Sequence, residues 1–337
     1  MASWPFGTRS VPVTPETTWR RRFSILTVFF TALLISWGGF VTSINAGMAV
    51  PDWPSTFGSY DPFKTGLPGW WMQTPVLAEH GHRLLGALVG ACTLILAGWT
   101  WMKDPRSWMR GLGLAALMLV IVQGTLGGLR VTENSIALAA FHASTAQIFF
   151  SMLVAMTLFT TTGWLRAADR PASDAPTASL RRLTLVTTAA LYGQIVLGAL
   201  LRQFGHGIDQ TFALIHITGA FVVTGLIFAA FVYIQKHFDA HPSLKRGGWA
   251  MLGLLGVQFA LGLFAYLVLI NEMSQAIRSG LQIGLTVSHV IVGGLLMAST
   301  VWTTLLAWRA PAPAAEPSGD SAAREPIPAP RSSTATS

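Results

Sequence analysis

Residues 79–101 read EHGHRLLGALVGACTLILAGWTW: two histidines between a glutamate and an arginine, followed by a mainly apolar run. An apolar run of this length is long enough to cross a bilayer as a helix. Ionisable residues at the mouth of a membrane helix are costly to place there, so they are candidates for function. Alternatively, such side chains merely reach into the headgroup layer. Taken alone, the cluster leaves both interpretations open.

The composition of the whole chain is that of a polytopic membrane protein. Of its 337 residues, 52% are hydrophobic and only 11% are charged, whereas soluble domains carry about 25% charged residues. The net charge of +8 is spread over short clusters between apolar runs, which membrane topology explains better than nucleic-acid binding does. The single cysteine, Cys92, lies inside an apolar run, so an intrachain disulfide is excluded.

Eight apolar runs are long enough to span a membrane. They predict helices at 23–44, 82–102, 111–131, 137–165, 182–203, 211–236, 248–270 and 281–308. The first run is longer than the apolar core of a signal peptide and no small-residue cleavage motif follows it, so we expect it to be retained. The sequence therefore predicts an all-α polytopic membrane protein with eight transmembrane helices.

Lysine and arginine are distributed unevenly between the two sides of these helices. Most of the 22 lie in the two tails and in the connections that follow the second, fourth and sixth helices. Cytoplasmic segments carry the excess of Lys and Arg. We therefore predict that both termini are cytoplasmic, in a bacterial cytoplasmic membrane, and that each even-numbered helix enters from the outer face.

Each even-numbered helix carries one histidine within its first third. These residues are His82, His142, His216 and His289. The predicted topology places all four at a similar depth near the outer leaflet. A lone histidine in a membrane helix is often only a hydrogen-bonding partner for a neighbour, but four at one depth indicate two functional pairs. His80, one residue off the common face, is expected to line a pocket or to reach the interface.

The neighbourhood of the histidines also indicates an internal repeat. Similar segments that begin with Gln and end with Arg, at 123–130 and 194–202, precede His142 and His216, and a weaker echo at 258–262 precedes His289. We predict two parallel four-helix bundles related by an axis along the membrane normal. The predicted units are an N-terminal tail (1–22), a first bundle (23–168), a cytoplasmic linker (169–181), a second bundle (182–309) and a disordered C-terminal tail (310–337).

Two imidazoles that face each other across a four-helix bundle can hold a haem iron axially. Zinc and copper sites usually add Cys, Met or carboxylate ligands within a few residues, and only Glu79 is near. A proton relay would need several acids within the helices, which are almost absent from their interiors. The four histidines therefore predict two haem sites, with one pair of iron ligands in each half.

Three arginines at the outer ends of helices are candidate partners for haem propionates, because guanidinium groups pair well with carboxylates. They are Arg83, Arg130 and Arg202. Binding of lipid headgroups is an equal alternative for each.

Glu79 distinguishes the first pair from the second. It lies three residues before His82, so both face the same side if the helix begins by Glu79. Ala213 and Thr286 occupy that position before His216 and His289. The first site is therefore expected to carry out chemistry and the second to hold a permanent cofactor. Glu79 could act as an acid and base or as a charged stabiliser, or it could simply favour the helix N-terminus.

These motifs together resemble the haem A synthase family. The likeness rests on Glu-x-x-His-Arg at 79–83, on one histidine at the outer end of each even-numbered helix and on Pro-Asp-Trp-Pro at 51–54, and it covers residues 22–308. The resemblance implies oxidation of the C8 methyl of haem O, through an alcohol, to the formyl group of haem A.

The resemblance also implies roles for individual residues, when the functional positions of the family are matched to positions of this sequence. His82 and His142 would flank haem O as catalytic residues together with Glu79, and His216 and His289 would ligate haem b. The expected partners are haem O itself, the haem O synthase (protohaem farnesyltransferase) that supplies it, an electron donor and membrane lipid, but not nucleic acid.

One departure from the family concerns the first outer loop. Many bacterial members carry a cysteine pair there, but this chain offers Val50 and Thr56, so a redox role for the loop is excluded. We expect the loop, 45–78, to cap the first site or to lie on the membrane surface.

Two alternatives to an enzyme remain: a di-haem b cytochrome and a haem-handling assembly factor. The common depth of the histidines argues against the first, and Glu79 beside one pair argues against the second.

Overall fold

The computed structural model describes residues 13–166, 174–272 and 278–309 of the chain. Within these ranges the protein is helical, and the only β pairing is one isolated bridge between Thr56 and Ser59. Eight helices are long and apolar enough to cross a membrane. This confirms the predicted all-α fold class and its eight spans.

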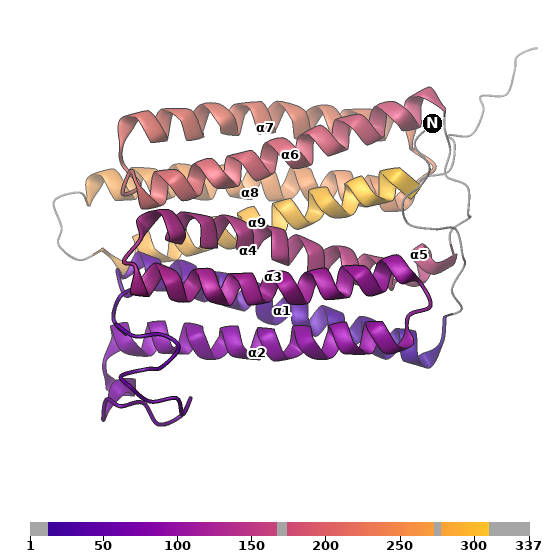
Figure 1. Ribbon diagram of the computed structural model, residues 1–337. Helices are drawn as coiled ribbons and strands as arrows, with labels where there is room; N and C mark the ends of the chain where they lie inside the picture. The colour runs from indigo at the N-terminus through magenta and orange to yellow at the C-terminus, as the bar shows by residue number, and fades with distance from the viewer. Residues whose placement is uncertain (1–12, 167–173, 273–277, 310–337) are drawn as a thin grey trace, which may run out of the picture.

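The eight long helices fall into two sets of four (Figure 1). They are α1 (Pro15–Ser43), α2 (Thr74–Lys103), α3 (Ser107–Thr132), α4 (Ile136–Phe159), α6 (Ala175–Gln203), α7 (Gln210–His237), α8 (Pro242–Asn271) and α9 (Gly280–Arg309). Two short elements complete the set, the 3-10 turn η1 (Trp70–Met72) and α5 (Thr162–Arg166).

Several helices begin well before their apolar runs, because the local sequence supplies N-terminal signals there. Proline occupies the first turn of α1, α2, α6 and α8, where its missing N–H is not needed. Thr14 and Asp174 cap α1 and α6 through side-chain oxygens. The predicted start of the second helix at 82 was therefore wrong. The polar stretch from Glu79 lies within α2, which begins at Thr74.

The predicted span 137–165 is divided in the structure. Helix α4 ends at Phe159 and the short helix α5 follows it. At the break the hydroxyl of Thr160 donates to Thr157 O (2.7 Å) and that of Thr161 donates to Leu158 O (2.8 Å). Such bonds to the backbone compete with helix continuation, so the apolar pattern alone overestimated the length of this helix.

The two sets of helices meet along their inner members. Helices α1 and α4 contact each other, as do α6 and α9, and across the molecule α1 contacts α9 while α4 contacts both α6 and α9. Exchanging α1 with α6 and α4 with α9 leaves this pattern unchanged, which is what the predicted repeat would produce. The start of α1 and the end of α9 lie at the same end of the molecule, on the right in Figure 1.

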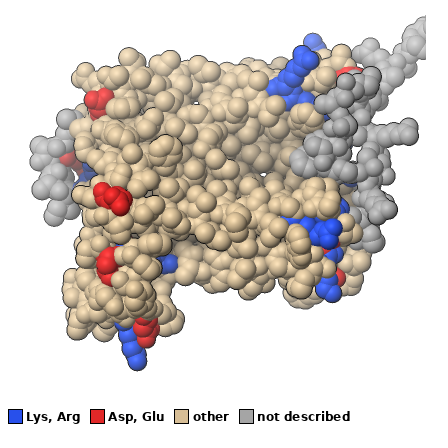
Figure 2. Space-filling view, in the orientation of Figure 1, with Lys and Arg blue, Asp and Glu red and all other residues tan. Residues whose placement is uncertain are grey.

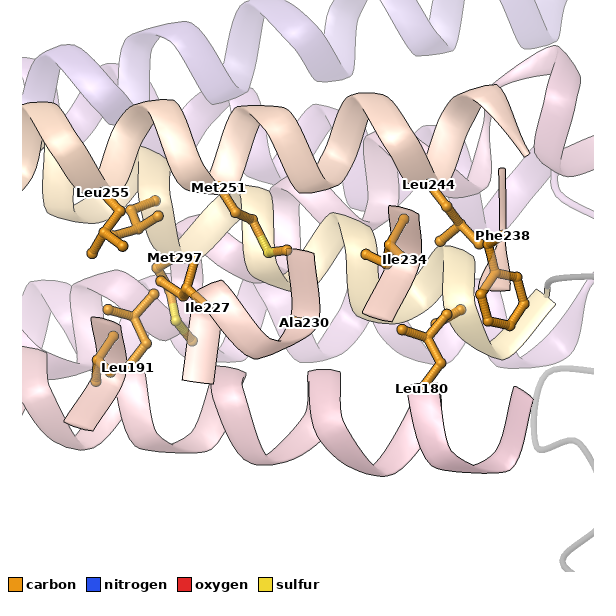
Figure 3. Close-up of a cluster of buried hydrophobic side chains, with 13 residues drawn as sticks. Leu180, Leu191, Ile227, Ala230, Ile234, Phe238, Leu244, Met251, Leu255 and Met297 are labelled. Carbon is orange, nitrogen blue, oxygen red and sulfur yellow. The ribbon is translucent and has the colours of Figure 1, made fainter. Parts of the chain in front are cut away.

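Apolar side chains pack most densely at that same end of each set. In the C-terminal set the buried cluster includes Leu180 of α6, Ile234 of α7, Leu244 of α8 and Ala307 of α9 (Figure 3). These positions come from the early part of α6 and α8 and the late part of α7 and α9, whereas the histidines lie early in α7 and α9. The N-terminal set has a corresponding cluster. Each bundle is thus closed by packed side chains at one end and carries its histidines toward the other.

Charged side chains avoid the middle of the molecule. On the face seen in Figure 2, Lys, Arg, Asp and Glu gather toward the two ends and leave a broad uncharged band. At the densely packed end, Asp104 accepts from Arg20 Nη2 (2.8 Å) and from Arg106 Nε (2.9 Å), and Arg106 also donates to Phe159 O (3.0 Å). This buried ion cluster ties α1 to α4 through the α2–α3 connection.

Candidate functional site

The four histidines predicted to act together form two matching pairs. His82 of α2 faces His142 of α4 with ring centres 6.4 Å apart and ring planes at 80°. His216 of α7 faces His289 of α9 with ring centres also 6.4 Å apart and planes at 72°. Each half of the chain therefore brings its own two imidazoles together, as the sequence predicted.

Each imidazole packs against a glycine on the preceding helix. A Cβ at Gly38, Gly127, Gly198 or Gly262 would lie 3.0, 3.2, 3.0 or 2.8 Å from the Cε1 atom of His82, His142, His216 or His289, respectively. Contacts this short leave no room for a side chain. The four glycines therefore fix how closely each ring approaches its neighbouring helix.

The dimensions of both pairs fit a haem iron. A metal lies about 2.0 Å from a ligating imidazole nitrogen, so an iron shared by two imidazoles holds their ring centres about 6 Å apart. Both pairs measure 6.4 Å. Over the described part of the chain, no cluster of three or more His, Cys, Asp or Glu side chains is arranged to hold a bare metal ion. Two facing imidazoles are instead the donor set of a haem whose other ligands come from the macrocycle.

Glu79 is buried at the head of α2, and both of its carboxylate oxygens are engaged. Its Oε2 accepts from the backbone N–H of Val50 (2.9 Å) and its Oε1 accepts from Arg83 Nη2 (2.9 Å). The side chain is 6% exposed. The two bonds fix the orientation of the carboxyl group. Glu79 thus combines a fixed negative charge with a direct link to the first outer loop.

Arg83 fastens the same loop to α2. Besides its bond to Glu79, it donates to three main-chain carbonyls, from Nη1 to Asp52 O (2.7 Å) and Ser55 O (3.1 Å) and from Nη2 to Val50 O (3.0 Å). The Pro-Asp-Trp-Pro segment is therefore held against α2. In this arrangement Arg83 binds the loop, and its predicted contact with a propionate remains a prediction.

Asp52 stabilises the turn within this loop. Its carboxylate accepts from the N–H groups of Phe57 and Gly58, both at 2.8 Å, and from the hydroxyl of Ser55. Desolvation alone would raise the pKa of Asp52, but these hydrogen bonds outweigh it and lower the pKa below its usual value. The turn therefore carries a charged aspartate at neutral pH.

His80 is a component of the same loop structure. It is 3% exposed, and its Nε2 lies 2.9 Å from Pro62 O while its Nδ1 lies 3.3 Å from Thr56 Oγ1. Its ring also meets Trp70 of η1 edge-on at 4.7 Å. Neither the pocket nor the interface expected from the sequence describes this residue, which is buried between α2 and the loop.

The other two arginines also donate to main-chain oxygens, Arg130 to one in the outer loop and Arg202 to one at the end of α1. Arg130 donates to Gly47 O (2.8 Å) and Arg202 donates to Thr42 O (3.2 Å). Arg202 belongs to the C-terminal half, whereas Thr42 belongs to α1, so this bond joins the two halves. Their predicted role with propionates is likewise not tested by these contacts.

The second site lacks the features that distinguish the first. Ala213, at the position that corresponds to Glu79, is buried and apolar, and Thr286 accepts a hydrogen bond from Gln282 Nε2 (2.8 Å). The α6–α7 connection spans residues 204–209, far shorter than the α1–α2 connection over 44–73. The carboxylate and the long, fastened loop thus occur only in the N-terminal half of the described structure.

Three glutamines beside the histidines were not predicted as site residues. Gln123, Gln194 and Gln258 contact His142, His216 and His289. The sequence signal was present, because each glutamine precedes by four residues the glycine that packs against the histidine. The pattern had been interpreted only as a sign of the repeat.

The chain is similar to known proteins along most of its length. The family described as cytochrome oxidase assembly protein matches residues 21–213, which include Glu79, His82 and His142. A haem A synthase of Methylobacterium sp. strain 4-46 is 26% identical over 343 residues, covering 82% of this chain and 92% of that protein. The haem A synthase of Symbiobacterium thermophilum is 24% identical over 78% of this chain and 91% of its own length. A third, from Alkalihalophilus pseudofirmus, is 30% identical over 40% of this chain and 44% of that protein.

Proposed function

Because the chain belongs to the cytochrome oxidase assembly protein family, we propose that it is a haem A synthase. It would oxidise the C8 methyl of haem O to a hydroxymethyl and then to a formyl group, with the oxygen supplied by water. The observation that carries the proposal is the difference between two otherwise matching imidazole pairs. Only the pair His82–His142 has a buried carboxylate and a fastened loop beside it.

In this proposal the N-terminal half binds the substrate and the C-terminal half binds a permanent cofactor. We assign His82 and His142 to the substrate, haem O, and His216 and His289 to a resident haem b. When bound, haem b would supply a one-electron carrier near the substrate. The second site suits a permanent cofactor because Ala213 leaves it without a carboxylate beside the ligands.

Glu79 acts in this proposal through its charge. Removing electrons from the methyl group leaves positive character spread over the porphyrin, and a fixed carboxylate stabilises that charge. The bonds from Val50 and Arg83 hold the orientation of the carboxyl group. This arrangement favours electrostatic stabilisation over proton transfer, because both oxygens already accept hydrogen bonds.

The outer loop excludes bulk water from the reacting edge. Arg83 and Arg130 hold it by main-chain carbonyls at 2.7–3.1 Å. Guanidinium groups with further donors at this depth would also pair with the propionates of a bound haem, as we propose for Arg130 and Arg202.

The proposed setting is the bacterial cytoplasmic membrane with both termini in the cytoplasm and both sites toward the outer face. Membrane lipid surrounds the uncharged band of Figure 2. Haem O would arrive from a haem O synthase (protohaem farnesyltransferase). Each of the two oxidation steps would release two electrons and two protons, and a partner that acts as electron acceptor would take the electrons through haem b.

Pigment analysis tests the proposed function. The full chain is expressed with a source of haem O, and the membrane haems are extracted and separated by chromatography. We expect haem A and its hydroxymethyl precursor in addition to haem b. Bound haem b without either oxidised product would instead support a di-haem b cytochrome, and haem O bound without conversion would support a haem-handling assembly factor.

A further inference from the structure

The three glutamines share one position relative to the histidines. Each lies on the helix that precedes the histidine's helix, one turn before the glycine that packs against the ring, in the pattern Gln-x-x-x-Gly. The pattern occurs at 123–127 in α3, at 194–198 in α6 and at 258–262 in α8. Each glutamine is therefore placed beside the ring that its glycine supports.

All three glutamine residues contact the Nδ1 atom of their histidine. In two cases the contact is with the main chain: the Nδ1 of His142 lies 3.2 Å from the main-chain oxygen of Gln123, and the Nδ1 of His289 lies 3.2 Å from the main-chain oxygen of Gln258. For His216, the side-chain amide of Gln194 approaches Nδ1 at 3.1 Å and also donates to the histidine's main-chain oxygen at 2.7 Å.

The side-chain amides add a second contact in the other two cases. With its oxygen toward Thr145, the Gln123 amide donates to His142 O at 3.1 Å. The Gln258 amide lies 3.2 Å from His289 Nε2. Each of these three imidazoles is thus held on one side by polar groups and on another by a glycine.

His82 is the exception. Leu34 occupies the position four residues before Gly38, where the other three helices have glutamine. The Nδ1 of His82 is fully buried and has no hydrogen-bond partner. Leu34 itself packs against the apolar cluster of the N-terminal bundle. The ring of His82 is therefore supported by Gly38 but not oriented by any polar group.

Partners of the non-ligating nitrogen orient a ligating imidazole and raise its basicity, and their loss typically weakens metal binding about 10- to 100-fold. We propose that the main-chain carbonyls of Gln123 and Gln258 and the side chain of Gln194 position three iron ligands. His82, whose Nδ1 has no such partner, is then the ligand that releases the iron, so that haem enters and leaves the first site on its side. This inference rests on the proposed function, in which the first site must exchange substrate for product while the second keeps its haem.

Carbon monoxide reports ligand release directly, because it binds a six-coordinate reduced haem only after an axial ligand dissociates. The probe is CO added to the full-length detergent-solubilised protein, loaded with haem O and haem b and reduced without oxygen. Transfer of haem to apomyoglobin then gives the release rates, with haem O or its oxidised products distinguished from haem b by chromatography. We expect the haem of the first site to bind CO and to leave at least about tenfold faster than haem b.

Two substitutions exchange leucine and glutamine at the position four residues before the glycine that packs against the histidine. Leu34→Gln should slow CO binding and release at the first site about tenfold and leave haem b unchanged, whereas Leu34→Met, the matched control, should behave as the unchanged chain. Gln194→Leu removes the side chain that contacts the Nδ1 of His216, so it should make haem b reactive with CO and raise its release about tenfold. If Leu34→Gln fails to accumulate, the Gln194→Leu result still decides.

Two outcomes would overturn the inference: haem b as the faster CO-binding haem in the unchanged chain, or a Gln194→Leu protein whose haem b stays inert and tightly bound. Neither readout requires turnover. A chain that binds haem O without converting it would therefore refute the proposed function but not this inference. A chain that never binds haem O would refute both.

Discussion

The backbone N–H of Val50 donates to the Glu79 carboxylate at 2.9 Å, which joins the first outer loop to the head of α2. One side chain thus lies one helical turn before His82 and also anchors the first outer loop. The two roles can be separated, because a glutamine can still accept from Val50 but has no charge.

Glu79→Gln is therefore expected to retain both haems and the loop while lowering conversion of haem O about a hundredfold, the scale of losing one electrostatic stabiliser. The measurement is the ratio of haem A to haem O in extracted pigments. Glu79→Ala should lose conversion and also expose the loop to added protease. Wild-type conversion by Glu79→Gln would show that Glu79 only anchors the loop.

Removal of a ligand should act on one site at a time. His289→Ala leaves His216 without a facing imidazole, so we expect loss of the b-type absorbance bands and retention of haem O. The matched variant is His142→Ala in the first pair, which should lose haem O and keep haem b. An unchanged b-type spectrum in His289→Ala would contradict the assignment of haem b to the second half.

A methyl group at the glycine behind a ligand should displace that ligand. In Gly262→Ala the new Cβ would lie 2.8 Å from His289 Cε1, so the ring must move and haem b content should fall several-fold. Gly256 lies on the same helix with open space around its Cβ position, which makes Gly256→Ala the control. Equal haem b content in the two purified variants would mean that the glycine contact does not set the ligand position.

At the end of the molecule away from the histidines, Asp104 should make a large contribution to the free energy of unfolding. Asp104→Asn removes the negative charge from a buried cluster with Arg20 and Arg106, and breaking a buried pair in this way costs about 3–5 kcal/mol. The expected result is a clear drop in the unfolding temperature in detergent with haem content initially intact. Asp239→Asn, which breaks an exposed pair with Lys245, should change the unfolding temperature little.

The same cluster gives a pH dependence with a definite sign. Although desolvation raises the pKa of Asp104, the hydrogen bonds and charge of Arg106, with the charge of Arg20, lower it below its usual value. The stabilisation is therefore complete above the ordinary carboxyl pKa of about 4 and is lost as the pH falls through the lower pKa of the folded state. Unfolding measured between neutral and acid pH should show this loss, and Asp104→Asn should lack it.

The sequence was sufficient for the features that obey simple patterns. Apolar length predicted eight spans, and the position of one histidine per even-numbered helix predicted that His82 meets His142 and that His216 meets His289. The number of spans follows from the length of the apolar runs, and the pairing of the histidines follows from their positions along the helices. Contacts between distant segments change neither property.

Features that depend on contacts between distant segments could not be predicted in this way. Charge counting treated Arg20 and Arg106 as cytoplasmic markers, yet both are buried around Asp104. His80 seemed marginal beside His82, yet it is packed beneath a loop whose course the composition does not specify. The α2 start was misplaced for a different reason, because the apolar run was followed and the proline of the first turn was not.

The neighbouring glycines of α1 place the two sites on opposite sides of a single backbone. Gly38 supports the ring of His82, and a Cβ at Gly39 would lie 3.8 Å from Val287 Cγ2, two residues before His289 on α9. An electron that leaves the first site for the second would therefore tunnel across one helix, through covalent bonds and contacts already in place. Charge transfer between the halves would then require no domain motion, and its rate would be set by driving force and reorganisation energy.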